Sequence, residues 1–446
     1  MTRPRHTRTA STLPLLGMLL VSGQVLAGGF ALNEMSAGSL GNAHAGGAAL
    51  AEDASTIFYN PAGLMRMQGR QFAASASGIR PSAEFDNRGS RTTSGPLTGG
   101  NGGDAGGWAF VPSLYYAMDI NRDMRFGIGV QTPFGLKTSY DRDWVGRYQA
   151  LKSDLKTVNI NPVLAYRVND LVSVGGGVSA QYIDVELSRA IDFGSVCVGV
   201  AGAGTCGAIG FLPQTRDGRV TVSGNDWGFG YNLGAMFTPR SDMRFGVTYR
   251  SKISHTLRGD ADFDKPAGLP GAIAASPTFT DTDARASLDL PESVNLSGYV
   301  DLDPKWSVMA DLQWLHWSRF KELRVRFANG APDSVTPEEW RNTWRVSLGA
   351  NYRYNDMWKL RAGVAYDQSP VRNDLRTPRV PDANRIWLAF GAQYKLSRQS
   401  AIDVGYAHLF VNNASLNKSE PPVGGTLIGD YDSDVNILSV QYSQSF

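Results

Sequence analysis

The sequence lacks several features that common classes of protein require. After residue 27 no apolar run reaches 18 residues, which excludes a helical membrane protein. The formal net charge is only +2, so the chain lacks the excess of positive charge that is typical of proteins that bind nucleic acid. Histidines number five, and no Gly-x-Ser-x-Gly motif is present, which argues against a hydrolase. We therefore expect no enzyme, no nucleic-acid partner and no cofactor.

Cysteine is equally scarce, and both copies lie in one short segment. Cys197 and Cys206 flank the sequence VGVAGAGT. No further cysteine or histidine lies beside the pair, so a metal site there would lack ligands. If the chain is exported, it meets oxidising conditions, and the pair is then predicted to form a disulfide.

The first 27 residues have the pattern of a secretory signal peptide. They begin with three arginines, continue with an apolar stretch at 13–21 and end with the small residues Val25 and Ala27 at the cleavage positions. We expect cleavage after Ala27, which makes Gly28 the first residue of an exported mature chain. The alternative is an ordinary buried N-terminal helix.

Glycine, tyrosine and tryptophan are abundant, with 50, 17 and 10 copies, and they recur in segments with a period of two. In 344–354 the even-numbered residues are apolar or aromatic and the odd-numbered residues are polar or small. Such a segment is a β-strand with one apolar face. Aromatic residues at the ends of the apolar faces, with lysines and arginines on the other face, favour a membrane barrel with a polar lumen. A soluble sandwich is the alternative.

Fourteen alternating segments can be recognised, an even number as in single-chain bacterial barrels. They span approximately 70–80, 108–118, 124–134, 155–168, 171–188, 225–238, 243–258, 284–302, 305–323, 341–355, 357–367, 384–397, 400–411 and 430–446. Short turns lie on one side, at 239–242, 303–305, 354–356 and 396–399, and long loops on the other, at 81–107, 135–154, 189–224, 259–283, 324–340, 368–383 and 412–429. The predicted fold is all-β, a 14-stranded antiparallel transmembrane β-barrel in the outer membrane of a Gram-negative bacterium. Its terminal Phe446 is typical of the signal that barrel-assembly machinery reads.

Two of the long loops are more apolar than those of a general porin. The 189–224 loop carries Val196 and Phe211 around the predicted disulfide. The 135–154 loop has apolar residues at helical spacing, which predicts a helix with one apolar face made of Trp144, Val145, Tyr148 and Leu151. Apolar loop surface either packs as a lid or binds an apolar molecule, and both remain open, with a capture groove between the two loops.

Several stretches resemble the FadL family of outer-membrane transporters for long-chain fatty acids and related hydrophobic molecules. They include GGFALNEMSAGSLGNAHAGGAALAEDASTIFYNPAGL near the start, GIGVQTPFGLKTSYDRDWVGRY and LDLPESVNLSGY, and the resemblance runs through essentially the whole mature chain. It implies that residues 28–69 form a hatch inside a barrel made of 70–446. Asn60, Pro61 and Ala62 match the family triplet at the tip of this hatch.

The resemblance also implies a route for a hydrophobic ligand. A kink in the third strand, here at Pro133 and Gly135, opens a hole in the wall, and proline suits such a break because it lacks a backbone donor. The alternative is that the strand simply ends there. A ligand would first cross the capture groove, where the candidate residues are Trp144, Val196 and Phe211. It would then enter an apolar pocket in the upper barrel, where the candidate residues are Phe30 and Leu32, with Phe58 on the hatch. It would leave sideways through the hole by spontaneous diffusion.

The substrate is less well determined by the sequence. Fatty-acid members of the family hold the carboxylate with a basic pair, of which the arginine corresponds to Arg189 and the lysine position to Thr336. Half of the pair is therefore missing, so aromatic hydrocarbons or other nonpolar compounds are an alternative cargo, and a nonspecific porin is a further one. Expected partners are hydrophobic small molecules, outer-membrane lipid and lipopolysaccharide, and the barrel is expected to be a monomer.

Overall fold

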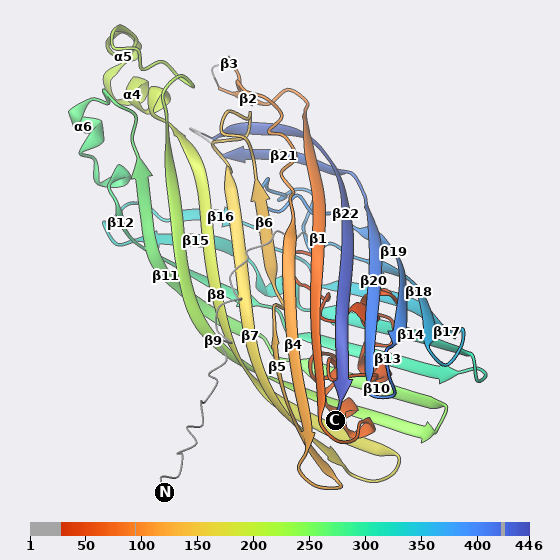
Figure 1. The fold of residues 1–446 in the computed structure, drawn as a ribbon. Coiled ribbons are helices and arrows are strands. Elements are labelled where there is room, and N and C mark those ends of the chain that lie inside the picture. Colours follow the sequence, from red (N-terminus) through yellow and green to blue (C-terminus); the bar gives the residue numbers. More distant parts are fainter. Residues whose placement is uncertain (1–27, 94, 421–423) are drawn as a thin grey trace, which may run out of the picture.

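The computed structural model describes residues 28–93, 95–420 and 424–446, and the predicted signal peptide at 1–27 lies outside this part of the chain. All strands belong to one antiparallel sheet (Figure 1). The sheet closes on itself because β1 (Gln71–Asn87) pairs with both β4 (Ala109–Asp119) and β22 (Gly425–Ser445). The predicted 14-stranded antiparallel barrel is confirmed.

Several strands of the wall are divided into two labelled pieces, and short extra strands extend the loops. The remaining strands are β2 (Arg91–Thr92), β3 (Gly95–Pro96), β5 (Met124–Gln131), β6 (Gly135–Ser139), β7 (Lys152–Arg167), β8 (Val172–Asp192), β9 (Asp217–Arg240), β10 (Met243–Arg250), β11 (Ile253–Asp264), β12 (Thr282–Leu290), β13 (Ser293–Asp301), β14 (Trp306–Leu315), β15 (Glu322–Phe327), β16 (Ser334–Pro337), β17 (Thr343–Arg353), β18 (Trp358–Asp367), β19 (Arg385–Lys395), β20 (Ser400–Val411) and β21 (Ala414–Glu420).

Strand boundaries differ from the sequence prediction mainly at the side of the long loops. β1 continues to Asn87, β9 already begins at Asp217, and the 412–429 loop contains β21. Beyond the membrane the outer face of a strand meets water, so the apolar alternation stops while the backbone ladder continues. The predicted strand 284–302 is interrupted between β12 and β13, where Pro291 has no amide to donate.

The helix predicted in the 135–154 loop is wrong. Its first residues form β6, and the following residues form consecutive turns. The Val145 amide donates to the Gly100 carbonyl (2.9 Å) and the Leu151 amide to the Ser188 carbonyl (2.9 Å). These tertiary partners replace intrahelical ones, although the predicted apolar side chains Trp144, Val145, Tyr148 and Leu151 are all buried.

The residues before β1 lie inside the barrel (Figure 1) and contain α1 (Ala37–Leu40), α2 (Gly47–Leu50), α3 (Thr56–Tyr59) and the 3₁₀ helix η1 (Pro61–Arg66). Most residues from 29 to 65 are buried. Glycines in the wall allow this close approach, since a Cβ at Gly246 would lie 2.0 Å from the Ala48 carbonyl oxygen. Helices α4 (Phe193–Ala201), α5 (Ala203–Ala208) and α6 (Gly271–Ala274), with η2 (Pro277–Phe279), lie in the long loops, and η3 (Trp317–Arg319) follows β14. Among the described residues no helix is long and apolar enough to cross a membrane.

Candidate transport path

A cavity of about 710 Å³ opens among the long loops. Arg189 and Val196 line it, as does Thr336. Much of its wall is apolar and consists of inward-facing side chains of β8, β9, β11 and β15. These side chains are Leu187, Val220, Val222, Phe263, Leu323, Val325 and Phe327. Its size lies within the range of small-molecule sites, and its shape is set by strands rather than by loops alone.

Two further basic residues line this cavity, and sequence reasoning missed both. Arg379 donates to the Lys152 carbonyl and to the Ser153 hydroxyl, each at 3.1 Å. Desolvation and the nearby Arg189 lower the pKa of Arg379 to about 10, so its guanidinium stays charged at neutral pH. Lys418 is only 8% exposed. The cavity therefore contains three cations.

Acidic groups lie close to these cations. A Glu420 carboxylate oxygen is 3.8 Å from a guanidinium nitrogen of Arg189. Glu338 is buried and accepts a hydrogen bond of 2.9 Å from the indole of Trp340. Burial raises the pKa of Glu338 to about 7, even though Lys418 and Arg379 act in the opposite direction. Near neutral pH this carboxyl group therefore changes charge beside the cations.

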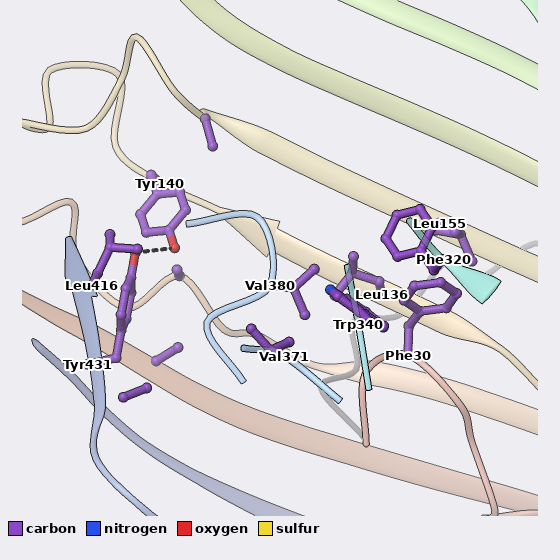
Figure 2. Close-up of a cluster of buried hydrophobic side chains, with 14 of the residues drawn as sticks. Phe30, Leu136, Tyr140, Leu155, Phe320, Trp340, Val371, Val380, Leu416 and Tyr431 are labelled. Carbon is purple, nitrogen blue, oxygen red and sulfur yellow. Dashed lines mark hydrogen bonds between the residues drawn. The ribbon is translucent and has the colours of Figure 1, made fainter. Parts of the chain in front are cut away.

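Below the cavity, Phe30 is enclosed by aromatic rings (Figure 2). Its ring centroid lies 4.7 Å from that of Trp317, 5.4 Å from that of Trp340 and 6.3 Å from that of Phe134. Leu323 packs against the same apolar cluster and also lines the cavity, so the cluster and the cavity are adjacent. An apolar surface therefore continues from the cavity to the N-terminal residues.

The third strand of the barrel is broken beside Phe30. β5 pairs with β7 up to Gln131↔Asn159, and β6 resumes at Gly135↔Lys156, so this strand carries one residue more than its partner. The Thr157 side chain fills the break, since its hydroxyl donates to the Phe134 carbonyl (2.7 Å) and accepts from the Phe134 amide (3.1 Å). This geometry is that of a bulge.

On its other side the broken strand separates from β4. Pairs between β4 and β5 begin at Leu114↔Val130 and run toward the short turns. Residues 109–113 of β4 pair with β1, but within the described chain they pair with no residue of β5 or β6. Nearer the long loops the backbone hydrogen bonding across this gap resumes, since the Ser139 amide donates to the Ala105 carbonyl (3.0 Å). Between the third strand and β4 the wall thus has a stretch without backbone pairing, and the predicted kink residues Pro133 and Gly135 border it.

The N-terminal segment occupies the inner side of this break. The Leu32 amide donates to the Pro133 carbonyl (2.8 Å), and the Gly135 amide donates to the Phe30 carbonyl (2.9 Å). Residues 30–32 therefore act as an antiparallel partner of the broken strand. The Leu32 side chain is buried in the second apolar cluster, which includes Leu64.

The Asn60-Pro61-Ala62 triplet joins the luminal segment to the wall. The Asn60 side-chain amide donates to the carbonyls of Ala48 (2.7 Å) and Ala235 (3.0 Å), and its oxygen accepts from the Ala62 amide (3.0 Å). Pro61 is the first residue of η1, where a missing amide costs nothing. Every polar function of this side chain is thus used.

Basic residues of the wall also bind the luminal segment. Arg244 donates to the Ala49 carbonyl (2.7 Å), and Arg250 donates to the Phe58 carbonyl (2.9 Å) and lies 4.6 Å from the Phe58 ring. Lys359 and Arg361 donate to the Glu52 carboxylate at 2.8 and 2.7 Å, respectively. The alternating sequence pattern predicts that these basic residues face the lumen. It does not predict their binding partners, because those depend on how the luminal segment folds.

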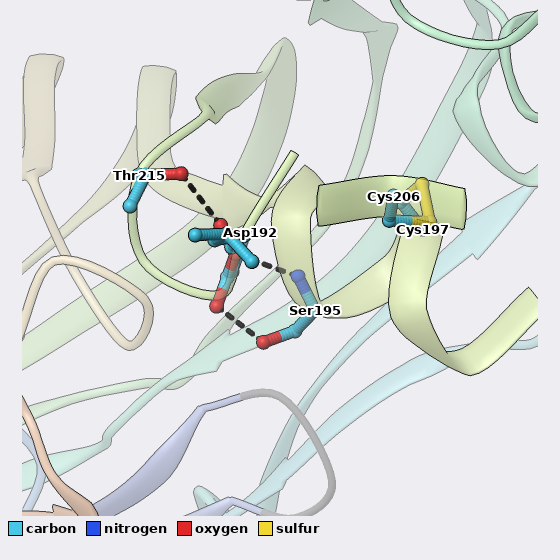
Figure 3. Close-up of a disulfide and its surroundings, with 6 residues drawn as sticks. Asp192, Ser195, Cys197, Cys206 and Thr215 are labelled. Atoms are coloured by element: carbon cyan, nitrogen blue, oxygen red, sulfur yellow. Dashed lines mark hydrogen bonds between the residues drawn. A yellow bond between two sulfur atoms is a disulfide. The ribbon is translucent and has the colours of Figure 1, made fainter. Parts of the chain in front are cut away.

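The loop after β8 is held by a disulfide between Cys197 and Cys206 (Figure 3). The Asp192 carboxylate caps α4 by accepting from the Ser195 amide (2.9 Å). Phe211 is buried against the disulfide, and Trp144 stacks on Tyr140 with the centroids 3.9 Å apart. Neither Phe211 nor Trp144 lines the cavity, so both residues act in loop packing.

Comparisons with known proteins agree with this geometry. A family model described as "Outer membrane protein transport protein (OMPP1/FadL/TodX)" matches residues 18–446. A putative outer membrane protein of Neisseria meningitidis serogroup B is 33% identical, over 98% of each chain. A long-chain fatty acid transport protein of Escherichia coli O6:H1 is 30% identical, over 91% of this chain and 92% of that protein. The crystal structure of a Pseudomonas aeruginosa FadL homologue superimposes with a TM-score of 0.86 at 27% identity, over 94% of this chain and 100% of that one.

Proposed function

The chain belongs to the OMPP1/FadL/TodX family of outer-membrane transport proteins, and from this premise we propose that it carries long-chain fatty acids into the outer membrane by spontaneous diffusion. The family consists of transporters and not of enzymes. Relatives about 30% identical are named long-chain fatty acid transport proteins. The chemistry of the cavity is the observation that carries the choice of substrate.

Capture takes place in the cavity among the loops. Its apolar walls bind the acyl chain, and burial contributes about 0.8 kcal/mol per methylene, so ten methylenes supply about 8 kcal/mol. The carboxylate is bound by Arg189, Arg379 and Lys418, which together replace the basic pair that is incomplete at Thr336. Although Glu420 lies 3.8 Å from Arg189, three cations beside an apolar wall suit a fatty acid better than an uncharged hydrocarbon, which favours an acid as the cargo.

Passage continues past Phe30. An acyl chain that enters the apolar cluster displaces the Phe30 ring from its aromatic neighbours, and this movement weakens the bond between the Phe30 carbonyl and Gly135. In this proposal residues 28–69 are a hatch that blocks a straight aqueous route. Wall contacts such as those of Asn60 and Glu52 keep most of the hatch in place.

Exit takes place sideways through the break in the third strand. The neighbouring β4 and the residue before it present apolar side chains to the outside, since Trp108, Phe110 and Leu114 are 67%, 46% and 44% exposed. An acyl chain leaving beside Pro133 therefore passes from one apolar environment to another and never enters bulk water. The gradient alone drives this step.

The choice of substrate is tested by mass spectrometry of the small molecules that co-purify with the barrel. We expect C14–C18 fatty acids, released when the protein is denatured. Recovery of aromatic or aliphatic hydrocarbons in place of acids would overturn the assignment.

A further inference from the structure

Three arginines lie side by side on the outer face of the barrel. The register of β11, β12 and β15 pairs Arg258 with Arg285 and Arg285 with Arg326. All three side chains are exposed. The preceding residues Leu257, Ala284 and Val325 are 6%, 3% and 6% exposed and face inward, which places the arginines on the outside.

This arrangement is unfavourable unless something outside the chain compensates it. Like charges directly opposite each other on neighbouring strands are destabilising. In the described part of the chain Arg258 and Arg285 form no salt bridge, and Arg326 approaches only Asp333, at 3.8 Å. Asp260 and Asp283, which pair with each other two residues further along the strands, form no salt bridge with these arginines either.

The depth of the row relative to the membrane follows from its neighbours. Arg258 pairs with Asn225 of β9, and two residues toward the short turns lies Trp227, which is 51% exposed. The Trp227 ring is 5.4 Å from that of Tyr182, and such outward aromatic residues mark the edge of the hydrocarbon layer. Two residues of a strand span about 7 Å, so the row lies just outside that edge, on the side of the long loops.

We propose that Arg258, Arg285 and Arg326 bind the phosphate groups of the glycolipid in the outer leaflet of the outer membrane. Guanidinium groups bind phosphate oxygens in bidentate fashion, and the apolar stems of the side chains can lie along the wall. A multiply phosphorylated headgroup would bridge adjacent arginines and remove the repulsion between them. Because the row lies near the long loops, the inner-leaflet phospholipids at the opposite end cannot reach it.

The test compares two triple variants of the complete barrel in detergent. One is Arg258→Gln/Arg285→Gln/Arg326→Gln. The control, Arg70→Gln/Arg122→Gln/Arg398→Gln, removes three exposed arginines at the end with the short turns. Native mass spectrometry measures the retention of bis-phosphorylated lipid A and of the same lipid without phosphates.

We expect the wild type and the control to retain the phosphorylated lipid at least tenfold better than the first variant. All three proteins should retain the dephosphorylated lipid equally weakly. Thermal unfolding without lipid provides a second measurement, because removal of the repulsion should leave the first variant at least as stable as the wild type. Equal retention of phosphorylated lipid by both variants, or equal retention of the two lipids by the wild type, would overturn the proposal. If the triple variant does not fold, Arg285→Gln alone should lower retention at least threefold, and an unchanged value would be equally decisive.

Discussion

The Gly135 amide donates a 2.9 Å hydrogen bond to the Phe30 carbonyl. Through this bond the segment around Phe30 takes the place that a neighbouring strand has elsewhere in the barrel. Phe30 also fills the apolar cluster below the cavity, so one residue contacts both the proposed pocket and the break in the wall. Displacement of Phe30 is therefore expected to change the pairing of the broken strand.

A Phe30→Ala variant tests this coupling by hydrogen exchange. Loss of a buried phenyl ring destabilises its surroundings by about 3–5 kcal/mol, which should loosen residues 30–32. We expect the Gly135 amide to exchange at least tenfold faster than in the wild type. Phe110→Ala, which removes a ring from the outer face of β4, should leave this rate unchanged. Equal protection of the Gly135 amide in both variants would mean that Phe30 does not control the pairing of the broken strand.

The attachment of the hatch can be tested at Asn60. Asn60→Asp keeps the acceptor for the Ala62 amide but removes both donors to the carbonyls of Ala48 and Ala235. Unsatisfied buried groups cost about 1–3 kcal/mol, so the hatch should open more often. Planar-bilayer recordings should then show more frequent conducting events. Asn121→Asp, in an exposed turn where only the side-chain oxygen is used, is the matched control and should behave as the wild type.

Binding of the carboxylate can be tested with Arg379→Gln. A charge-assisted hydrogen bond contributes about 1.5–3 kcal/mol, so hexadecanoate should bind roughly 10- to 100-fold more weakly. Hexadecanol has the same chain without the charge, and its affinity should change less than twofold. Thr278→Val, a neutral change in the wall of the same cavity, should alter neither affinity. A parallel loss of affinity for acid and alcohol would mean that Arg379 supports the shape of the cavity only.

The pH dependence of binding should follow Glu338, whose pKa is raised to about 7. Its neutral form is favoured in the folded state, so the stability that it contributes falls as the pH rises from about 4.5 through about 7. Over the same range the new negative charge competes with the ligand for Lys418 and Arg379. Hexadecanoate affinity should therefore fall several-fold between about pH 6 and pH 8, as measured by calorimetry. Glu338→Gln should abolish this dependence, and an unchanged profile in that variant would assign it to another group.

The sequence predicted those parts of the structure that the membrane determines. Lipid on one side and a polar lumen on the other impose the alternation seen in 344–354, so the number of strands and their pairing in order could be read from it. Outside the membrane both faces of a strand meet polar surroundings, so the alternation ends before the strand does. For that reason the sequence predicts an end of β1 and a start of β9 that differ from those in the structure. For Trp144 and its neighbours the sequence left packing and ligand binding open; they are buried, and their backbone conformation is set by partners such as Gly100, distant in the chain.

The candidate site was predictable only where a motif marks it. Pro133 and Asn60 lie in recognisable sequence patterns, whereas Thr157, which fills the break, has no such signal. Arg379 lies in a loop that folds back to Lys152 and Ser153, and only closure of the barrel brings it near Arg189. Contacts of this kind depend on tertiary structure and leave no periodic trace in the sequence.

Deletion of Pro133 shows whether the cargo leaves through the wall at the third strand. The deletion removes the one extra residue and restores a continuous register with β7, which should straighten the strand so that it also pairs with residues 109–113 of β4. Pro133→Ala keeps the extra residue and is the control. Uptake of radiolabelled hexadecanoate by cells with equal amounts of each protein is the measurement. We expect the deletion to lower uptake at least tenfold while hexadecanoate affinity changes less than twofold, and we expect the control to transport normally. Undiminished uptake with the wall closed would contradict exit at the third strand.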